Sequence, residues 1–510
     1  MSAAPLSLSS KVAVIGAGAM GSGIAQIAAV AGHTVKLLDA REGAAASAIE
    51  GIRTQLNKLA DKGRLTLEAA QAAGERLSVA TEVSELADAA LIIEAIVEDL
   101  AAKQSLFVSL ESIVSDDAIL STNTSSISIT AIGAALKRPE RLAGLHFFNP
   151  APLMPLVEII SGIGTDASVA DTLFATAKAW GKTPVHARST PGFIVNRVAR
   201  PYYAEALRLL QEGAADVATI DAVLREAGGF RMGPFELMDL IGHDVNFAVT
   251  RSVWTAFFND TRFTPSLIQQ ELLEGGFLGR KSGRGFYDYR EGAVKLLPAT
   301  EAPRSLNATV TLHGNSDAAT AFATRLSNAN IALTSGAITS DGRIATVGDA
   351  VVFVTDGRSA TQRASDSGIA NTVLIDLALD YASTTRIAIS CAQQCAPAAR
   401  DHAIAMLQAA GLQVSLMKDI PGLAVMRTVA MLANEAADAV NQGVCSAADV
   451  DSAMRLGVNY PRGPLAWAEQ IGVATVRDVL LNLAHSYGED RYRVSPRIQQ
   501  ACYAGGSLHD

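Results

Sequence analysis

Short apolar runs alternate with helical stretches along the first 191 residues. Lys11–Ile15 (KVAVI) and Thr34–Leu38 (TVKLL) have the β-branched, apolar character of buried parallel strands, and Ser22–Ala31 between them has a helical pattern. Another strand-like run, LIIEAIVE, follows at residues 91–98. Because strands that alternate with helices build parallel sheets, we expect an α/β domain over residues 1–191.

The first of these connections carries a glycine fingerprint. Gly16, Gly18 and Gly21 form G-x-G-x-x-G directly after the first strand, and Asp39 ends the second strand. In a dinucleotide site such glycines permit a tight turn, close approach of the pyrophosphate and close helix packing, while the acid accepts the ribose hydroxyls. The acid would repel a 2′-phosphate, so the fingerprint predicts NAD rather than NADP, with Arg41 as the feature that argues the other way.

Composition excludes several other classes. Forty-two Lys and Arg against 51 Asp and Glu give a net charge of −9, which argues against nucleic-acid binding through a general positive field. No apolar stretch reaches the length of about 18 residues that a membrane span needs, and MSAAPLSLSS lacks the features of a signal peptide. The four cysteines suit neither a disulfide framework nor a zinc site. We therefore expect a cytoplasmic, multidomain protein without a metal.

The remaining chain divides by its patterns. Residues 192–297 are helical and rich in alanine, with Pro191-Gly192 as the break. Residues 308–416 again alternate strand-like runs (308–312, 350–355, 373–375 and 385–390) with helices, but only Gly314 remains of a fingerprint. This segment is expected to be a degenerate Rossmann-like domain without a second NAD site. A second helical domain is expected over 417–510, and 298–307 is the expected linker.

The second helical segment repeats the first. Pro421–Arg427 echoes Pro191–Arg197 at an offset of 230 residues, and the same offset aligns Glu435 with Glu205 and Asp451 with Asp221. A constant offset over about fifty residues indicates an internal duplication. We expect residues 417–500 to pack on 192–290 as an intramolecular pseudo-dimer, with homo-oligomers also possible.

Several motifs behind the fingerprint are specific in combination: NTSS at 123–126, HFFNP at 146–150, PGFIVNR at 191–197 and MGPFEL at 232–237. In this order they resemble the L-3-hydroxyacyl-CoA dehydrogenase family, from about residue 11 to about residue 289. The resemblance implies a Rossmann domain followed by a helical domain, and NAD-dependent oxidation of a (3S)-hydroxyacyl-CoA to a 3-oxoacyl-CoA.

The resemblance also implies catalytic roles. His146 matches the general base, Glu158 its paired carboxylate, Ser125 a contact to substrate and cofactor, and Asn196 the amide that orients the substrate. The chemistry agrees, because a neutral histidine can accept the hydroxyl proton and a carboxylate can hold its other ring nitrogen. Each residue alone also has a structural interpretation: a hydrogen-bonded core histidine, a solvent-facing strand acid, a turn cap or a helix-start residue. At the position of Asn196 the second copy has Met426, so it is expected to have lost this role.

Other matches concern binding. The cofactor contacts implied are Gly16, Gly18, Gly21, Asp39, Glu98, Lys103, Ser125, Asn149 and Lys281. The substrate contacts implied are Lys62, Ser125, Asn149 and Asn196, and Gln55 stands where a family member has a CoA-contacting serine.

The length and the duplicated tail resemble bacterial members of the family that act on 3-hydroxyadipyl-CoA in phenylacetate breakdown, or on 3-hydroxybutyryl-CoA. Arg231, in a Phe-Arg-Met sequence, could pair with the terminal carboxylate of an adipyl chain or simply lie on a solvated turn. General fatty-acid β-oxidation is an alternative. A non-catalytic NAD-binding structural protein and a CoA-independent hydroxy-acid dehydrogenase are remoter alternatives.

Overall fold

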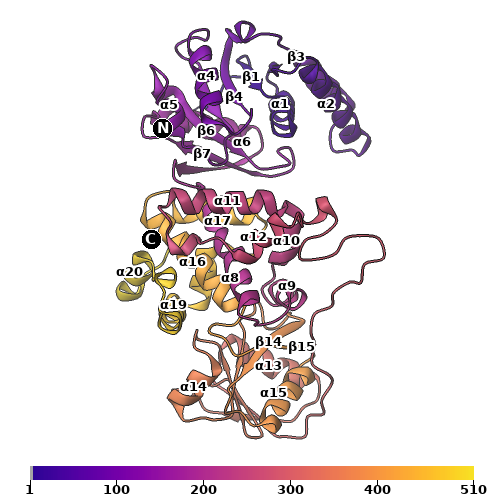
Figure 1. Ribbon diagram of the computed structural model, residues 1–510, viewed down its shortest axis with the longest axis vertical. Helices are drawn as coiled ribbons and strands as arrows, with labels where there is room; N and C mark the ends of the chain where they lie inside the picture. The colour runs from indigo at the N-terminus through magenta and orange to yellow at the C-terminus, as the bar shows by residue number, and fades with distance from the viewer. Residues whose placement is uncertain (1–3) are drawn as a thin grey trace. The chain divides into compact units, whose positions relative to one another are not determined.

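The computed structural model describes residues 4–510 and divides into two compact units, each built on one β-sheet (Figure 1). The first unit comprises the chain up to Arg197 together with Gln442–Val458. The second comprises Val198–Asn441 and Asn459–Asp510.

The first unit contains an eight-stranded sheet in the order β3-β2-β1-β4-β5-β6-β7-β8. Its first six strands in this order run parallel and reproduce the strand order 3-2-1-4-5-6 of a dinucleotide-binding fold. The strands are β1 (Lys11–Ile15), β2 (Val35–Leu38), β3 (Leu77–Val79), β4 (Ala89–Glu94), β5 (Ile119–Thr122), β6 (Leu142–Phe147), β7 (Leu156–Ser161) and β8 (Thr183–Arg188).

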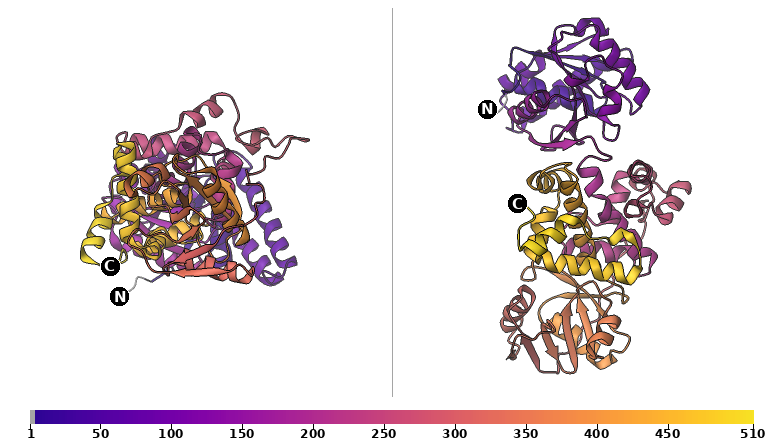
Figure 2. Two further views of the ribbon diagram at one scale, coloured as in Figure 1. Left: turned by 90° about the horizontal axis from the view of Figure 1, so that it is seen from below. Right: turned by 90° about the vertical axis from the view of Figure 1, so that its left-hand side faces the viewer.

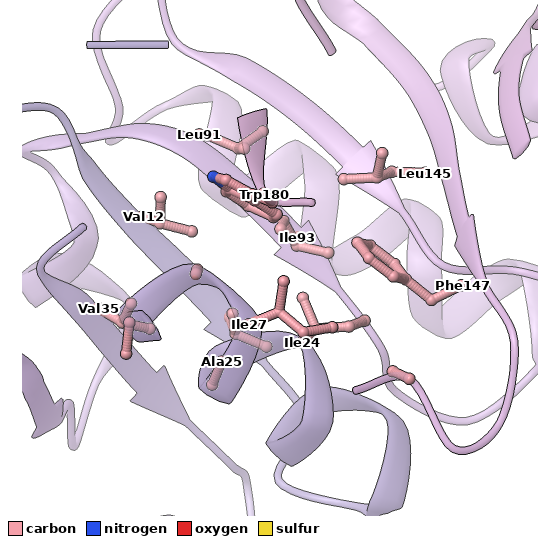
Figure 3. Close-up of a cluster of buried hydrophobic side chains, with 14 of the residues drawn as sticks. Val12, Ile24, Ala25, Ile27, Val35, Leu91, Ile93, Leu145, Phe147 and Trp180 are labelled. Atoms are coloured by element: carbon pink, nitrogen blue, oxygen red, sulfur yellow. The ribbon is translucent and has the colours of Figure 1, made fainter. Parts of the chain in front are cut away.

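Helices cover this sheet and complete its core. They are α1 (Ala19–Ala31), α2 (Ala44–Asp61), α3 (Leu67–Glu75), α4 (Leu100–Glu111), α5 (Ile129–Gly133) and α6 (Ala167–Ala179). Figure 3 shows Val12, Ile93 and Phe147 of three strands with Ile24 of α1 and Trp180 at the end of α6 in one buried cluster. Full burial of such side chains contributes about 1.5–3 kcal/mol each, so this cluster holds α1 and α6 on the sheet.

The helix that follows the glycine fingerprint, α1, begins earlier in the chain than the apolar pattern predicts. The pattern gives a helix from Ser22, whereas α1 begins at Ala19, and the Ser22 amide already donates to the carbonyl of Gly18 at 2.9 Å. The predicted strand over Lys11–Ile15 coincides with β1.

The second unit begins with the helices of the first repeat and ends with those of the second. The first set comprises α8 (Arg200–Gln211), α9 (Val217–Glu226), α10 (Pro234–Ile241), α11 (His243–Ala256) and α12 (Leu267–Glu274), after the short α7 (Val195–Val198). The second set comprises α16 (Val425–Asn441), α18 (Pro464–Ile471), α19 (Val473–Tyr487) and α20 (Pro496–Ala504).

Helix α16 packs on α8, and reciprocal ion pairs link the two repeats. Arg427 of the second repeat donates to Glu205 of the first at 2.7 Å, and Arg262 of the first donates to Glu435 of the second at 3.0 Å. Glu205 and Glu435 are equivalent under the offset of 230. All four side chains are buried, so each carboxylate has its charge compensated by the other repeat.

Between these two helical sets in the sequence, the chain forms a seven-stranded sheet in the order β10-β9-β11-β12-β13-β14-β15, coloured orange in Figure 2. Its strands are β9 (Val310–His313), β10 (Leu333–Gly336), β11 (Ala345–Val347), β12 (Ala350–Val354), β13 (Thr372–Ile375), β14 (Arg386–Cys391) and β15 (Gln413–Leu416). Its helices are α13 (Asp317–Asn328), α14 (Ala360–Ser367) and α15 (Pro397–Ala409).

The internal repeat extends into this sheet, beyond the residues that the sequence motifs align. β14 and α15 lie 230 residues after β7 and α6, residue for residue, and β13 is antiparallel to β14 as β6 is to β7. The duplication therefore includes the last strands of the Rossmann domain as well as the helical domain.

One segment of the second repeat belongs to the first unit. Helix α17 (Ala447–Gly457) packs on β7 and β8, and its equivalent in the first repeat, α9, packs on β14 of the second sheet. Residues 442–458 therefore differ from the expectation that 417–500 packs on 192–290, because they belong to the first unit.

Candidate functional site

The glycine loop lies between β1 and α1, and its three glycines differ in surroundings. Gly16 has φ +104°, and a Cβ there would lie 2.4 Å from the Ala95 carbonyl oxygen. A Cβ on Gly21 would lie 1.7 Å from the Gly16 carbonyl oxygen, whereas a Cβ on Gly18 would meet nothing within 4 Å. The turn and the helix contact thus require Gly16 and Gly21, and Gly18 leaves open space at the start of α1, whose first turn has no acidic residue. This is a fit for a pyrophosphate.

Asp39 follows β2 and closes the same loop. Its Oδ2 accepts a hydrogen bond from the Ala17 amide at 2.7 Å, and its Oδ1 accepts from the Arg41 Nε at 3.1 Å. Partial burial acts to raise the pKa of Asp39, but the hydrogen bonds from Arg41 and Ala17 outweigh it and lower the pKa to about 2. The carboxylate is therefore charged at neutral pH, where it can accept ribose hydroxyls.

Lys103 is turned into the protein. Its side chain is buried, and Nζ donates to Glu94 Oε1 at 2.6 Å, with Glu98 Oε2 at 3.3 Å. Glu94 also accepts from the Thr122 hydroxyl at 2.6 Å. The sequence analysis did not single out Glu94 or Thr122. A second acid in LIIEAIVE, nine residues before a lysine at the start of a helix, was the signal available for Glu94.

Glu98 orders the NTSS turn. Its Oε1 accepts from the Thr124 hydroxyl at 2.6 Å and from the Ser125 and Ser126 amides at 2.9 and 3.1 Å. Burial opposes ionisation, but these bonds and the charge of Lys103 lower the pKa of Glu98. Asn196 joins this group, because its Nδ2 donates to the Ser125 carbonyl at 3.4 Å. The structure thus brings Ser125, Glu98 and Asn196 together.

His146 and Glu158 face each other across the antiparallel pair β6–β7. His146 Nδ1 lies 2.7 Å from Glu158 Oε2, and the two side chains are only 7% and 1% exposed. The other carboxylate oxygen, Oε1, accepts from the Ile194 and Val195 amides at 3.1 and 3.0 Å. Glu158 therefore fixes the imidazole and the start of the PGFIVNR helix together.

Aromatic rings surround the imidazole. Its centroid lies 4.5 Å from that of Phe148 and 6.0 Å from that of Phe193. The Asn123 side-chain oxygen accepts from the Phe147 amide at 2.8 Å, which ties the NTSS turn to the histidine strand. With Nδ1 held by Glu158, Nε2 is the ring nitrogen that can accept a proton from a substrate hydroxyl.

A cavity of about 620 Å³ lies along α1 and α2, lined by Gln55, Arg64 and Trp180 among others. Gln55, the residue that departs from the family pattern, faces it, and so does Arg64, which the sequence analysis did not name. Lys62, the matched lysine, is exposed at the end of α2, and Asn149 is exposed after β6.

Two further expected contacts belong to the second unit. Lys281 is partly exposed and forms an ion pair with Asp244, and Arg231 is exposed in the turn after α9.

The described residues 4–510 contain neither a membrane-spanning helix nor a metal-binding cluster. No helix within this range is long and apolar enough to cross a membrane. No group of three His, Cys, Asp or Glu side chains in the same range is placed to hold a metal ion.

Comparison with known families matches most of the chain. Residues 11–190 match the NAD-binding domain of 3-hydroxyacyl-CoA dehydrogenase. Residues 192–289 and 422–507 both match the C-terminal domain of that enzyme. Residues 352–421 match the reduced Rossmann-fold domain of 3-hydroxybutyryl-CoA dehydrogenase.

Individual relatives agree. The chain is 46% identical over 489 residues to 3-hydroxyadipyl-CoA dehydrogenase of Escherichia coli, covering 96% of each chain. It is 40% identical over 285 residues to human mitochondrial hydroxyacyl-coenzyme A dehydrogenase, covering 55% of this chain and 91% of the human one. A crystal structure of 3-hydroxybutyryl-CoA dehydrogenase from E. coli superposes with a TM-score of 0.86 at 45% identity, covering 97% of this chain and 98% of the other.

The fold and the matched domains define an NAD-binding oxidoreductase. More particularly, the chain belongs to the 3-hydroxyacyl-CoA dehydrogenase family. It has 3-hydroxyacyl-CoA dehydrogenase activity, with NAD as cofactor. The predicted fold class is confirmed, including the shortened Rossmann unit and the second helical repeat.

Proposed function

We propose that the chain oxidises (3S)-3-hydroxyadipyl-CoA to 3-oxoadipyl-CoA, with His146 as the general base. The observation that carries this proposal is the buried contact of 2.7 Å between His146 and Glu158, next to Ser125 and Asn196 in the first unit. The carboxylate orients the imidazole and stabilises the imidazolium that forms when the substrate hydroxyl loses its proton.

The glycine loop and Asp39 hold NAD, which when bound accepts the hydride from C3 of the substrate. The O3–H proton passes to His146 Nε2, and the C3–O bond becomes a carbonyl, so the products are the 3-oxoacyl-CoA, NADH and a proton. Ser125 and Asn196 contribute by donating hydrogen bonds to the substrate oxygens. Glu98, Lys103, Asn149 and Lys281 complete the cofactor contacts in this proposal, and the buried Lys103 is paired with Glu94 and Glu98.

The CoA moiety is assigned to Lys62 and Asn149, which are both exposed. Preference for an adipyl chain is supported by the full-length similarity to the E. coli 3-hydroxyadipyl-CoA dehydrogenase. Arg231 is the cation proposed for the terminal carboxylate, and its exposure leaves it accessible to such a group. The enzyme would then serve phenylacetate breakdown in the cytoplasm, with 3-hydroxybutyryl-CoA as the alternative substrate.

We further propose four domains: 1–191, 192–297, 308–416 and 417–510. The family matches at 11–190 and 192–289 support the boundary at 191/192, and those at 352–421 and 422–507 support a boundary close to 417.

NADH formation at 340 nm tests the proposal. A panel of 3-hydroxyacyl-CoAs from C4 to C16, with 3-hydroxyadipyl-CoA, is assayed with NAD and with NADP, using wild type, His146→Ala and Arg231→Ala. We expect the highest kcat/KM on the adipyl ester with NAD and a loss of roughly 10²–10⁴ in His146→Ala. Arg231→Ala should lower kcat/KM selectively for the adipyl ester. Equal loss on the butyryl ester would reject the role of Arg231, and full activity of His146→Ala would reject the base.

A further inference from the structure

The second repeat contributes a helix to the sheet that carries Glu158. The backbone of Val444, just before α17, accepts a hydrogen bond from the Arg188 amide at the end of β8, at 2.8 Å. The adjoining Gly443 lies against the Arg188 guanidinium, where a Cβ would be 3.2 Å from Nη1. This segment therefore continues the hydrogen bonding of the sheet edge on which β7 and β8 lie.

Cys445 shows that the segment approaches the candidate dyad. Burial, followed by the negative charges of Asp449 and Glu158, raises the pKa of the Cys445 thiol to about 12. The thiol is half-buried and neutral at physiological pH, so it adds no charge of its own to the field around Glu158.

The last residue of α17 contacts the residues that hold Glu158. A Cβ on Gly457 would lie 2.7 Å from Leu156 Cδ2 and 3.0 Å from Val195 Cγ2. Leu156 begins β7 and is fully buried, and the Val195 amide donates to Glu158 Oε1 at 3.0 Å. Leu156 Cδ2 is the end of a flexible side chain and can move aside, but Val195 is β-branched and stiff about χ1. A larger side chain at 457 would therefore press on Val195, whose amide holds Glu158.

The other repeat has a different residue here. Under the offset of 230, Ala227 corresponds to Gly457 and Asp376 to His146. Asp376 itself accepts the amide hydrogen bonds at the start of α16, from Ala424 and Val425 at 2.9 and 2.8 Å, so that copy contains no carboxylate–imidazole pair to align. Ala227, at the end of α9, therefore carries a Cβ in the copy that has no carboxylate–imidazole pair to position.

We propose that α17 of the C-terminal repeat positions the His146–Glu158 pair of the N-terminal domain, and that Gly457 is the positioning residue. The inference rests on the proposed function, because alignment of the pair matters only if His146 is the base. The second repeat then does more than cover the first helical domain: it supplies one wall of the catalytic strand pair.

The test compares Gly457→Val and the milder Gly457→Ala with Ala448→Val, a substitution at an exposed position of the same helix. Steady-state kinetics with a 3-hydroxyacyl-CoA are measured in the wild-type and Glu158→Gln backgrounds, with NADH affinity and circular dichroism as checks of folding. In the wild-type background we expect kcat to fall roughly tenfold to a hundredfold in Gly457→Val, since small misplacements of catalytic groups have effects of this size. Gly457→Ala should show a smaller loss, with NADH affinity within about twofold of wild type in each.

In the Glu158→Gln background the same substitution should change kcat by less than about threefold, because two changes that act through one interaction are not additive. A folded Gly457→Val enzyme with wild-type kcat, or an equal loss in both backgrounds, would overturn the inference. If Gly457→Val does not fold, the same comparison with Gly457→Ala decides. A wild-type enzyme inactive on every CoA ester, or an active His146→Ala, would instead mean that the proposed function fails.

Discussion

His146 and Glu158 are register partners on antiparallel strands, twelve positions apart in sequence and 2.7 Å apart in space. In the second sheet the equivalent register partners are Asp376 and Ala388. In the second sheet the carboxylate is on the other strand of the pair. Like Glu158, Asp376 accepts hydrogen bonds from the amides at the start of a helix, but it holds no imidazole. One duplicated scaffold thus carries a carboxylate–imidazole pair in one copy and, in the other, a carboxylate that holds only a helix start.

Glu158→Gln should lower kcat at least about tenfold, because the neutral amide cannot stabilise the imidazolium that forms on His146. NADH formation at 340 nm measures this, and Glu68→Gln, an exposed acid in α3, is the matched control. Wild-type kcat in Glu158→Gln would show that the pair is structural only.

Asp39→Ala should raise the KM for NAD roughly tenfold to a hundredfold, since hydrogen bonds to a charged group are worth about 1.5–3 kcal/mol. It should also raise the ratio of NADP to NAD activity, because the negative charge that repels a 2′-phosphate is gone while Arg41 remains. Initial rates with both cofactors test this against Glu42→Ala, an exposed acid nearby. An unchanged cofactor ratio would contradict the assignment of Asp39.

One NAD should bind per chain, although the chain contains two Rossmann-type sheets. Helix α13 carries Asp317 in its first turn, where a carboxylate repels phosphate, whereas the first turn of α1 has no acid. Isothermal titration calorimetry gives the stoichiometry. Gly18→Asp, which places a carboxylate in the open space before α1, should abolish binding. A second site that survives in Gly18→Asp would refute the assignment.

Asp376 should make stability depend on pH. Burial raises the pKa of Asp376 from 3.8 to about 6, against the opposing effect of its backbone hydrogen bonds. The folded protein then binds this proton more tightly than the unfolded chain, so the contribution of Asp376 to the free energy of unfolding decreases as pH rises from about 4 to about 6. Asp376→Asn keeps an acceptor oxygen but does not titrate.

Thermal unfolding of wild type and Asp376→Asn at pH 4 to 6.5 measures this effect. The Tm of wild type minus that of the variant should decrease as pH rises through this range. A difference that is constant or increases would show that the carboxyl group is ionised throughout.

Some elements could be predicted from short-range patterns in the sequence alone. β1 coincides with its apolar run, and Gly16 and Gly21 stand where positive φ and close backbone contact leave no space for a Cβ. The family resemblance of HFFNP, of the strand at 156–161 and of PGFIVNR implied His146, Glu158 and Asn196, and β6 and β7 place His146 opposite Glu158.

Contacts between distant segments depend on the fold. Lys103 matched a cofactor contact, yet it is buried against Glu94, because the direction of a side chain is set by whichever partner the packed chain brings near. The repeat at an offset of 230 is visible in the sequence. That its helix α17 packs on β7 of the first unit is not visible there, because the offset between the repeats is the same whichever sheet the helix packs on. The motifs can thus be recognised in the sequence, whereas the close approach of Gly457 to Leu156 and Val195 exists only after the chain has folded.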